Sequence, residues 1–533
     1  MLPDNGSNKT SVSRSVRSPP RIMLVIGILL AGAADAAAAG NTGVVRDLAS
    51  RVGPVVGSAL ACRDIARPRI QTIVDKFAAV IREASPIEAE RADLTQFLDR
   101  SVAEGRNAVT SGQTDCKLAD RQLADLERSI AAPSLSAVIG PSSASASAAA
   151  ATSTAPVTAS PPQRGMTDRE IRFGIAAPFS GAAKELGRQM KLGIDTAFNR
   201  VNDAGGVEGR MLRLIAADDG YEPVRTAEAM KQLYEKDQVF GIVGNVGTPT
   251  AVVAIPYALE RRMLFFGAFT GANVLRRDPP DRYVFNYRAS YVQETDAVVR
   301  YLVKIRKLQP KQIAVFAQQD SYGDAGFAGV AKAFRALGAN DSTIVRLNYT
   351  RNTVDVEEAV NQLKAQKNIK AVVMVSTYRA AARFIEKTRD LYPQMIYTNV
   401  SFVGSTALAE ELKLLGARYA NGVIVTQVVP AVSGYSSIVL EYKNALAKYF
   451  PGEAPDYVSL EGFVAANVLI QAIKRAGPQF DTEKLIDVLE GTRNLDLGLG
   501  TSLSFGRAEH QASHKVWGTA LDETGKFQPI ELE

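Results

Sequence analysis

The chain runs Ile171-Arg172-Phe173-Gly174-Ile175-Ala176-Ala177 and then turns at Pro178-Phe179-Ser180-Gly181. This short, mainly apolar run predicts a strand buried on both faces, as in a parallel sheet covered by helices. A helix is expected next and ends at Gly205-Gly206, because apolar residues recur at helical spacing: Leu186, Met190, Ile194, Ala197, Phe198 and Val201. Strand, turn and helix together form the repeating unit of an α/β fold.

The same unit recurs through residues 166–533. Helical patterns separate most of the expected strands, which fall at 171–177, 212–217, 239–244, 263–267, 312–317, 344–349, 371–376, 394–399, 422–426 and 515–521. So many units predict two sheets, and therefore two lobes. Parallel sheets of this kind bind ligands at the carboxyl ends of their strands.

Polar loops follow several of these strands, at 178–181, 244–250, 267–272, 319–324 and 376–379. In one of them Thr248 is expected to cap the next helix, and its glycines let backbone N–H groups face a carboxylate. In another, Thr270 offers a hydroxyl. Each loop alone is also explained as an ordinary turn, but five loops supplied by both halves of the region favour a ligand cleft.

The N-terminus has the three parts of an export signal, which we assign to residues 1–39. Basic residues such as Arg21 precede the apolar run 22–31, and small residues follow as far as Gly40. An uncleaved membrane anchor is the alternative. Export predicts an oxidising compartment outside the cytoplasm, where disulfides persist.

Residues 40–130 form a predicted helical region that contains both cysteines of the chain, Cys62 and Cys116. In an exported protein we expect these two to be bridged, because a small helical domain buries little surface and gains from a cross-link. Two unpaired buried thiols are the alternative. Residues 131–165 consist almost entirely of Ala, Ser, Thr and Pro and predict a flexible linker.

Composition excludes several classes of protein. The hydrophobic content of 46% is too high for a wholly disordered chain. With 62 Lys and Arg against 56 Asp and Glu, and no dense basic run, nothing predicts nucleic-acid binding. The two histidines, His510 and His514, are expected in an exposed loop, not at a metal. The carboxylates Asp218-Asp219 are expected to belong to an ordinary strand-end loop.

Catalytic and cofactor motifs are also missing. Gly241, Gly244 and Gly247 have the spacing G-x-x-G-x-x-G, which is not the dinucleotide-binding pattern. The sequence has no phosphate-binding loop and no nucleophile elbow. We therefore expect neither an enzyme nor a bound cofactor.

In their order along the chain, these segments resemble the type I periplasmic solute-binding proteins of ABC transporters, in the branched-chain amino-acid-binding family. The resemblance covers about residues 168–533 and is carried by 171–181, 204–210, 218–219, 243–250, 269–272 and 320–323. It implies two α/β lobes joined by three crossovers, with lobe 1 over about 168–288 and 430–505. Lobe 2 would hold about 289–429 and 506–533.

The resemblance also implies a function and a site. Ligand closes the hinge between the lobes, and the closed form docks on a membrane permease. Loops matching Gly247-Thr248 and Phe269-Thr270 hold the carboxylate of the ligand in the family. The other positions that we carry over as ligand-binding candidates are Ser180, Leu186, Tyr322, Thr377, Tyr378 and Ser401.

Two departures from the family pattern stand out. Members that bind α-amino acids place a glutamate just before the segment 403–405 to pair with the ammonium group, and this chain has Ser401 there. Either Glu294, Asp320 or Asp324 replaces that glutamate, or the ligand lacks an α-amino group, because an unpaired buried ammonium is costly. Tyr221 stands where a leucine/isoleucine/valine-binding protein has a cysteine, so the matching disulfide is absent.

We therefore expect a periplasmic binding protein that captures a small carboxylated solute for an ABC permease. The alternative is an envelope ligand sensor or regulator that uses the same fold without transport. The helical region and the linker motivate this alternative, since a simple transport receptor needs neither.

Overall fold

The computed structural model describes residues 42–84, 88–111, 114–131 and 163–532. The predicted export signal and most of the predicted linker lie outside these residues. The described residues fall into two compact units, one within 1–153 and one within 154–533. No helix in the described ranges is both long and apolar enough to cross a membrane.

The first unit is built from the helices α2 (Thr42–Ala61), α3 (Arg67–Ala84), α4 (Glu88–Thr110) and α5 (Cys116–Ala131). Helix α2 contacts the other three. Glycines let α2 and α4 approach closely, because a Cβ at Gly57 would lie 2.0 Å from the carbonyl oxygen of Val102. The Sγ atoms of Cys62 and Cys116 form a disulfide that ties the end of α2 to the start of α5.

Lobe 1 of the second unit contains a parallel sheet whose described strands have the order β2-β1-β3-β4-β5. Its strands are β1 (Glu170–Ala177), β2 (Met211–Asp218), β3 (Gly241–Val243), β4 (Leu264–Phe266) and β5 (Val284–Phe285). The helices of this lobe are α6 (Lys184–Asp203), α7 (Pro223–Lys231), α8 (Thr248–Glu260), α15 (Ser437–Tyr449), α16 (Tyr457–Ala476) and α17 (Thr482–Glu490).

Lobe 2 is built on a second sheet, whose described strands have the order β12-β11-β10-β9-β8-β6-β7. They are β6 (Ile313–Gln318), β7 (Val345–Tyr349), β8 (Ala371–Val375), β9 (Ile396–Asn399), β10 (Ile424–Gln427), β11 (Trp517–Leu521) and β12 (Phe527–Ile530). Strand β11 pairs antiparallel with both of its neighbours, β10 and β12, and the other pairs are parallel. The helices are α9 (Tyr291–Arg300), α10 (Ser321–Ala336), α11 (Glu357–Lys364), α12 (Tyr378–Arg389), α13 (Ser405–Leu415) and α14 (Ala417–Ala420).

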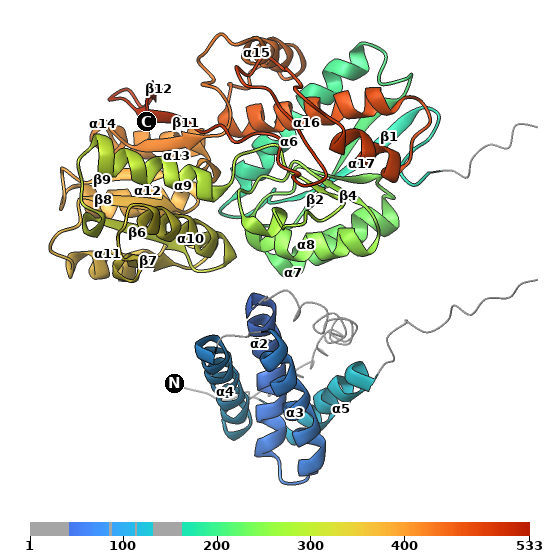
Figure 1. Ribbon diagram of the computed structural model, residues 1–533, viewed down its shortest axis with the longest axis vertical. Helices are drawn as coiled ribbons and strands as arrows, with labels where there is room; N and C mark the ends of the chain where they lie inside the picture. Colours follow the sequence, from blue (N-terminus) through green and yellow to red (C-terminus); the bar gives the residue numbers. More distant parts are fainter. Residues whose placement is uncertain (1–41, 85–87, 112–113, 132–162, 533) are drawn as a thin grey trace, which may run out of the picture. The chain divides into compact units, whose positions relative to one another are not determined.

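The two lobes lie side by side (Figure 1). In the described part of the chain, three segments pass between them: after β5, after β10 and after α17. The first and third passages pair with each other, since the Asn286 N–H donates to the carbonyl of His510 at 2.7 Å. The predicted α/β architecture with two sheets and three crossovers is confirmed.

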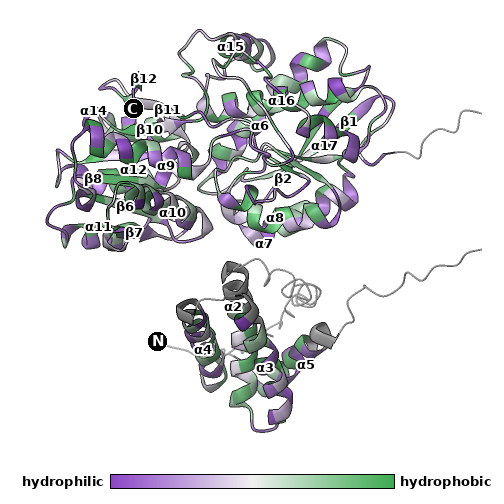
Figure 2. Ribbon diagram, in the orientation of Figure 1, coloured by the Kyte–Doolittle hydropathy of each residue, from purple (hydrophilic) through white to green (hydrophobic). Residues whose placement is uncertain are grey.

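The strands agree with the sequence pattern because burial on both faces requires apolar residues at every position. All residues of β6 and β8 are buried, and Figure 2 shows hydrophobic strands between helices that carry hydrophilic residues. The short strand β5 and the C-terminal strand β12 were not predicted. The first has two residues, and the second, Phe527–Ile530, contains Pro529 and lies at the sheet edge, where a missing N–H is tolerated.

Replacing both Cys62 and Cys116 with serine should destabilise the helical unit by about 2–4 kcal/mol, because the open chain regains the conformational freedom that the disulfide removed. Calorimetry of the full chain should show a lower melting temperature for one transition and no change in the other, since residues 163–532 contain no cysteine. Unfolding curves that do not differ between wild type and variant would contradict this expectation.

Candidate functional site

Two threonines meet where strands of lobe 1 end. The hydroxyl oxygens of Thr248 and Thr270 lie 2.7 Å apart and share a hydrogen bond. Thr248 does not cap α8 as expected, because it is already the first helical residue, and Gly247 occupies the cap position. Gly247 has a φ of 107°, and a Cβ there would lie 2.3 Å from the ring of Tyr221, so only glycine fits this turn.

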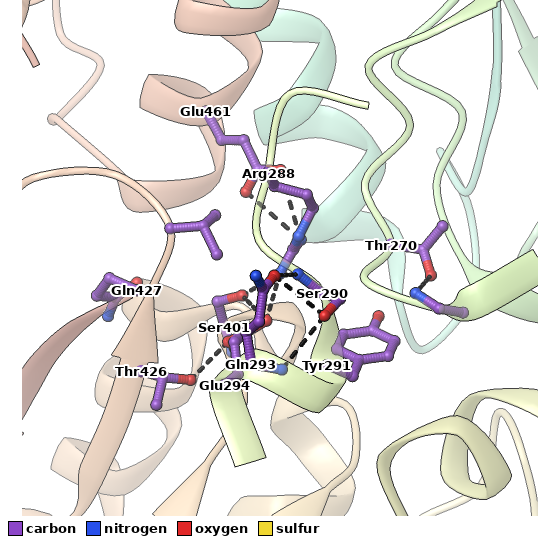
Figure 3. A network of polar contacts seen from close by, with 12 residues as sticks. Thr270, Arg288, Ser290, Tyr291, Gln293, Glu294, Ser401, Thr426, Gln427 and Glu461 are labelled. Carbon is purple, nitrogen blue, oxygen red and sulfur yellow. Dashed lines mark hydrogen bonds and ion pairs between the residues drawn. The ribbon is translucent and has the colours of Figure 1, made fainter. Parts of the chain in front are cut away.

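Tyr291, at the start of α9, lies near Thr270 of this pair (Figure 3). Its N–H donates to the carbonyl of Gly271 at 2.8 Å, next to Thr270. Its hydroxyl is fully buried and makes no hydrogen bond of good geometry among the described residues, although Thr270 lies close enough to lower its pKa. Burial raises the pKa of Tyr291 to about 12, so the hydroxyl remains a neutral donor. Three hydroxyls, of which those of Thr248 and Thr270 bond each other, therefore gather in the buried region between the two lobes.

Five buried rings lie between the lobes; we call them the aromatic cluster: Tyr221, Phe269, Tyr291, Tyr322 and Phe402. The ring of Phe402 stacks on Phe269 of lobe 1, with centroids 5.0 Å apart and an interplanar angle of 28°. On the other side it lies 4.6 Å from the ring of Tyr322 in lobe 2. Pairs at these distances attract each other in addition to the surface that they bury.

Ser401 belongs to a network of buried charges around Arg288, drawn in Figure 3. Arg288 donates to the carboxylate of Glu294 at 2.8 Å, to Glu461 at 3.4 Å, and to the hydroxyl of Ser401. The N–H of Ser401 and the hydroxyl of Thr426 also donate to Glu294, at 2.7 and 2.5 Å. These charges tie lobe 2 to α16 of lobe 1.

Glu461 is the least satisfied charge of this network. Its one recorded hydrogen-bonding partner among the described residues is Arg288. Burial is the main cause that raises the pKa of Glu461 to about 7, with Arg288 opposing and Glu294 adding to the shift. The nearby charges raise the pKa of Arg288 despite its burial.

The comparisons with known proteins agree with this two-lobed architecture. The model of the family described as "Periplasmic binding protein" matches residues 170–526. The chain belongs to the periplasmic binding protein family. It is therefore a solute-binding protein and not an enzyme.

The relatives give the degree of similarity. A "Leu/Ile/Val-binding protein homolog 3" from Brucella melitensis is 27% identical, over 62% of this chain and 86% of its own length. The crystal structure of a possible leucine/isoleucine/valine-binding protein from Rhodopirellula baltica is 38% identical, with a TM-score of 0.65, over 70% of this chain and 99% of its own. A substrate-binding periplasmic protein from Ralstonia solanacearum is 27% identical, with a TM-score of 0.62, over 68% and 100%.

Other candidate residues of this binding protein lie around the same cleft. Leu186 of lobe 1 packs against Gly404 and near Tyr378 of lobe 2, since a Cβ at Gly404 would lie 2.5 Å from a Leu186 methyl. Thr377 is buried, and its N–H donates to the hydroxyl of Tyr349 at 3.0 Å. Ser180 lies apart from these residues, because its hydroxyl donates to Asp218 in a partly exposed loop.

A polar contact joins the two lobes near Tyr221; we call it the rim bridge. Arg351 of lobe 2 pairs with Glu222 of lobe 1 at 2.9 Å and with Asp320 at 3.0 Å. Asn352 beside it donates to the carbonyl of Gly220 at 3.1 Å. Gln318 reaches Tyr221 across the lobes at 3.1 Å. The rim bridge thus adds side-chain contacts between the lobes to the three chain segments that connect them.

The two pairs that could have suggested a metal have other roles. His510 stacks on the ring of Phe285, with centroids 3.8 Å apart, whereas His514 bonds to Gln293. Asp218 accepts from Ser180 and Arg225, and Asp219 accepts from Thr226 and the N–H of Tyr221. Within the described ranges no cluster of three or more potential metal ligands occurs.

Several central residues were not predicted from the sequence: Arg288, Tyr291, Phe402 and Glu461. Tyr221 was noted only for the missing disulfide. One signal was available, because Glu461 interrupts the apolar helix pattern of 457–473 and a charge inside such a helix needs a partner. Phe402 gave no comparable signal, since one aromatic residue in an apolar loop is ordinary.

Replacing Glu294 with glutamine should lower the free energy of unfolding by about 3–5 kcal/mol, because Arg288 would then lose a buried carboxylate. Chemical denaturation of the purified protein measures the change. Asp324→Asn serves as the control, because the Asp324–Arg346 pair is exposed on the Asp324 side and should cost no more than about 1 kcal/mol. Equal losses in the two variants would contradict the assignment.

Stability should also depend on pH through Glu461. Its pKa in the folded protein, about 7, exceeds the ordinary 4.5. Between these values the folded chain keeps a proton that the unfolded chain releases, so the free energy of unfolding should fall as the pH rises. Denaturation from pH 5 to 7.5 should give a smaller slope for Glu461→Gln. Some slope should remain, because burial also raises the pKa of Asp219, to about 6. Identical slopes would refute the role of Glu461.

Proposed function

We propose that this chain is the extracytoplasmic solute-binding component of an ABC transporter and that it captures a small carboxylated solute by closure of its two lobes. The observation that carries the proposal is the group of buried hydroxyls of Thr248, Thr270 and Tyr291 in the buried region between the two lobes. A carboxylate there would accept from hydroxyls that otherwise bond each other or make no hydrogen bond of good geometry among the described residues.

The remaining candidates are assigned by their contacts. Phe269 and Tyr322 belong to the aromatic cluster and would contact the body of the solute. Side chains from both lobes would be needed for closure, because a solute that bridges them shifts the population toward the closed form. Gly247 would shape the turn that presents Thr248. We assign the other candidates, Leu186, Thr377, Tyr378 and Ser401, to the walls of the cleft and Ser180 to its edge.

The solute class and the partner follow from the family. The Brucella melitensis relative is named for leucine, isoleucine and valine, which are all carboxylates. We propose an amino acid or a related acid for this chain. The partner would be a membrane permease that recognises the closed form, and the protein would act in the periplasm after export.

The helical unit favours a second candidate function, an envelope sensor or regulator with the same cleft. Helices α2 to α5 form a compact unit of their own, outside the residues that the family model matches. Uptake of a bound, radiolabelled acid by cells with and without the gene separates the two. Lower uptake without the gene supports transport, whereas unchanged uptake together with binding supports the regulator.

Thr248→Ala and Thr270→Ala should each weaken binding of a carboxylate by about 1–3 kcal/mol, because each removes a buried hydrogen-bonding partner. Thermal shifts against a panel of amino acids and related acids identify a ligand, and isothermal titration calorimetry then measures each variant.

Thr353→Ala provides the control for both variants. Its hydroxyl bonds only within its own turn, to the carbonyl of Thr350 at 2.7 Å. Affinity in this control should equal that of the wild type. If Thr248→Ala and Thr270→Ala also bind as the wild type does, the carboxylate is not held by these hydroxyls.

A further inference from the structure

The carboxylates that flank the cleft already have partners. Glu294 accepts from Arg288, Ser401 and Thr426, and Asp320 pairs with Arg351. Glu222 pairs with Arg351 and Asn352, and Asp324 pairs with Arg346. Asp219 accepts from neutral groups, Thr226 and the N–H of Tyr221, and Glu461 accepts from Arg288 at 3.4 Å. An ammonium group that entered between the lobes would lose its water and would have to displace these partners to reach a carboxylate.

A cation, in contrast, lies beside the loop of Thr270, because Arg276 donates to the carbonyl oxygen of Thr270 at 3.5 Å. Arg276 donates to the carbonyl oxygens of Ala272 and Arg288, each at 2.9 Å, and to the side-chain oxygen of Gln511 at 2.5 Å. None of its recorded hydrogen-bonding partners in the described part of the chain is a carboxylate. Arg276 therefore adds positive charge beside Thr270, which favours an anionic ligand and disfavours a cationic group.

The same loop that lacks the family glutamate supplies an aromatic ring. Phe402 follows Ser401 directly, and its ring stands between Phe269 of lobe 1 and Tyr322 of lobe 2. A solute that enters between these rings must take part of the space that Phe402 fills. A flat ring is the group that best recovers the lost stacking, because it presents the same π-faces.

We propose that the cleft selects an aryl carboxylate without an ammonium group. Its carboxylate accepts from Thr248, Thr270 and Tyr291, and its ring replaces that of Phe402 between Phe269 and Tyr322. This inference rests on the proposed function, because it uses the same hydroxyls as the carboxylate site.

Isothermal titration calorimetry of the full-length protein tests the inference with matched acids. L-phenylalanine is 3-phenylpropanoate with an added α-amino group. In 3-cyclohexylpropanoate a saturated, non-planar ring replaces the phenyl ring of 3-phenylpropanoate. We expect 3-phenylpropanoate to bind at least about tenfold more tightly than L-phenylalanine, from the cost of the unpaired ammonium. 3-Phenylpropanoate should also bind about 2- to 10-fold more tightly than the cyclohexyl acid, because this is the effect expected of one aromatic pair.

The outcomes separate this inference from the proposed function. Tighter binding of L-phenylalanine or L-leucine than of 3-phenylpropanoate would overturn the inference, while a carboxylate site would stand. Equal affinity of the phenyl and cyclohexyl acids would overturn the aromatic part. Failure of every acid in the series and in the wider panel to bind would overturn both proposals.

Phe402→Leu tests the exchange of rings while keeping an apolar side chain that supports folding. The variant removes the competing ring, so affinity for 3-phenylpropanoate should rise by about 2- to 10-fold. Its thermal unfolding curve reports whether it is folded. A folded variant with a tenfold lower affinity would overturn the exchange, because Phe402 would then be a contact of the ligand.

Discussion

A single buried arginine organises the region between the lobes. Arg288 is 1% exposed, and such a charge is tolerated only when carboxylates and polar groups surround it. Glu294 on α9, Glu461 on α16 and the hydroxyl of Ser401 meet this need, and Glu294 in turn fixes the backbone of Ser401. The position of the loop that carries Phe402 follows from these contacts. The arrangement of the cleft is thus a consequence of satisfying one charge.

Much of the fold could be predicted because buried parallel strands appear in the sequence as short, mainly apolar runs. The run 171–177 and the apolar strands of lobe 2 are readable one at a time, and the polar loops at their ends indicated where a cleft would lie. The proximity of Thr248 and Thr270 could be predicted for the same reason, because both lie in loops at strand ends. Tyr291 and Phe402 were not, because their roles depend on how the lobes meet, and no local pattern reports that. Thr248 also shows that a residue typical of one motif can serve another, since its hydroxyl bonds to Thr270 instead of capping α8 as expected.

The two positions at which the sequence departs from the resemblance both serve contacts within the protein. Ser401 stands where the resemblance expects a glutamate, and its hydroxyl and N–H donate to Glu294. A second carboxylate at this position would lie next to Glu294 and repel it. Tyr221 stands in a loop where the resemblance expects a cysteine. Its ring contributes to the aromatic cluster, and its hydroxyl accepts from Gln318 of the other lobe.

The rim bridge has a consequence for the time that a solute spends inside. Arg351 must release Glu222, and Asn352 must release Gly220, before the lobes can separate at this edge. Both contacts are only partly buried, so their contribution to the equilibrium is about 1 kcal/mol or less. Contacts that break during exit but do not touch the solute act mainly on the dissociation rate. The rim bridge would therefore slow the separation of the lobes, and with it the exit of a solute, without itself contacting that solute.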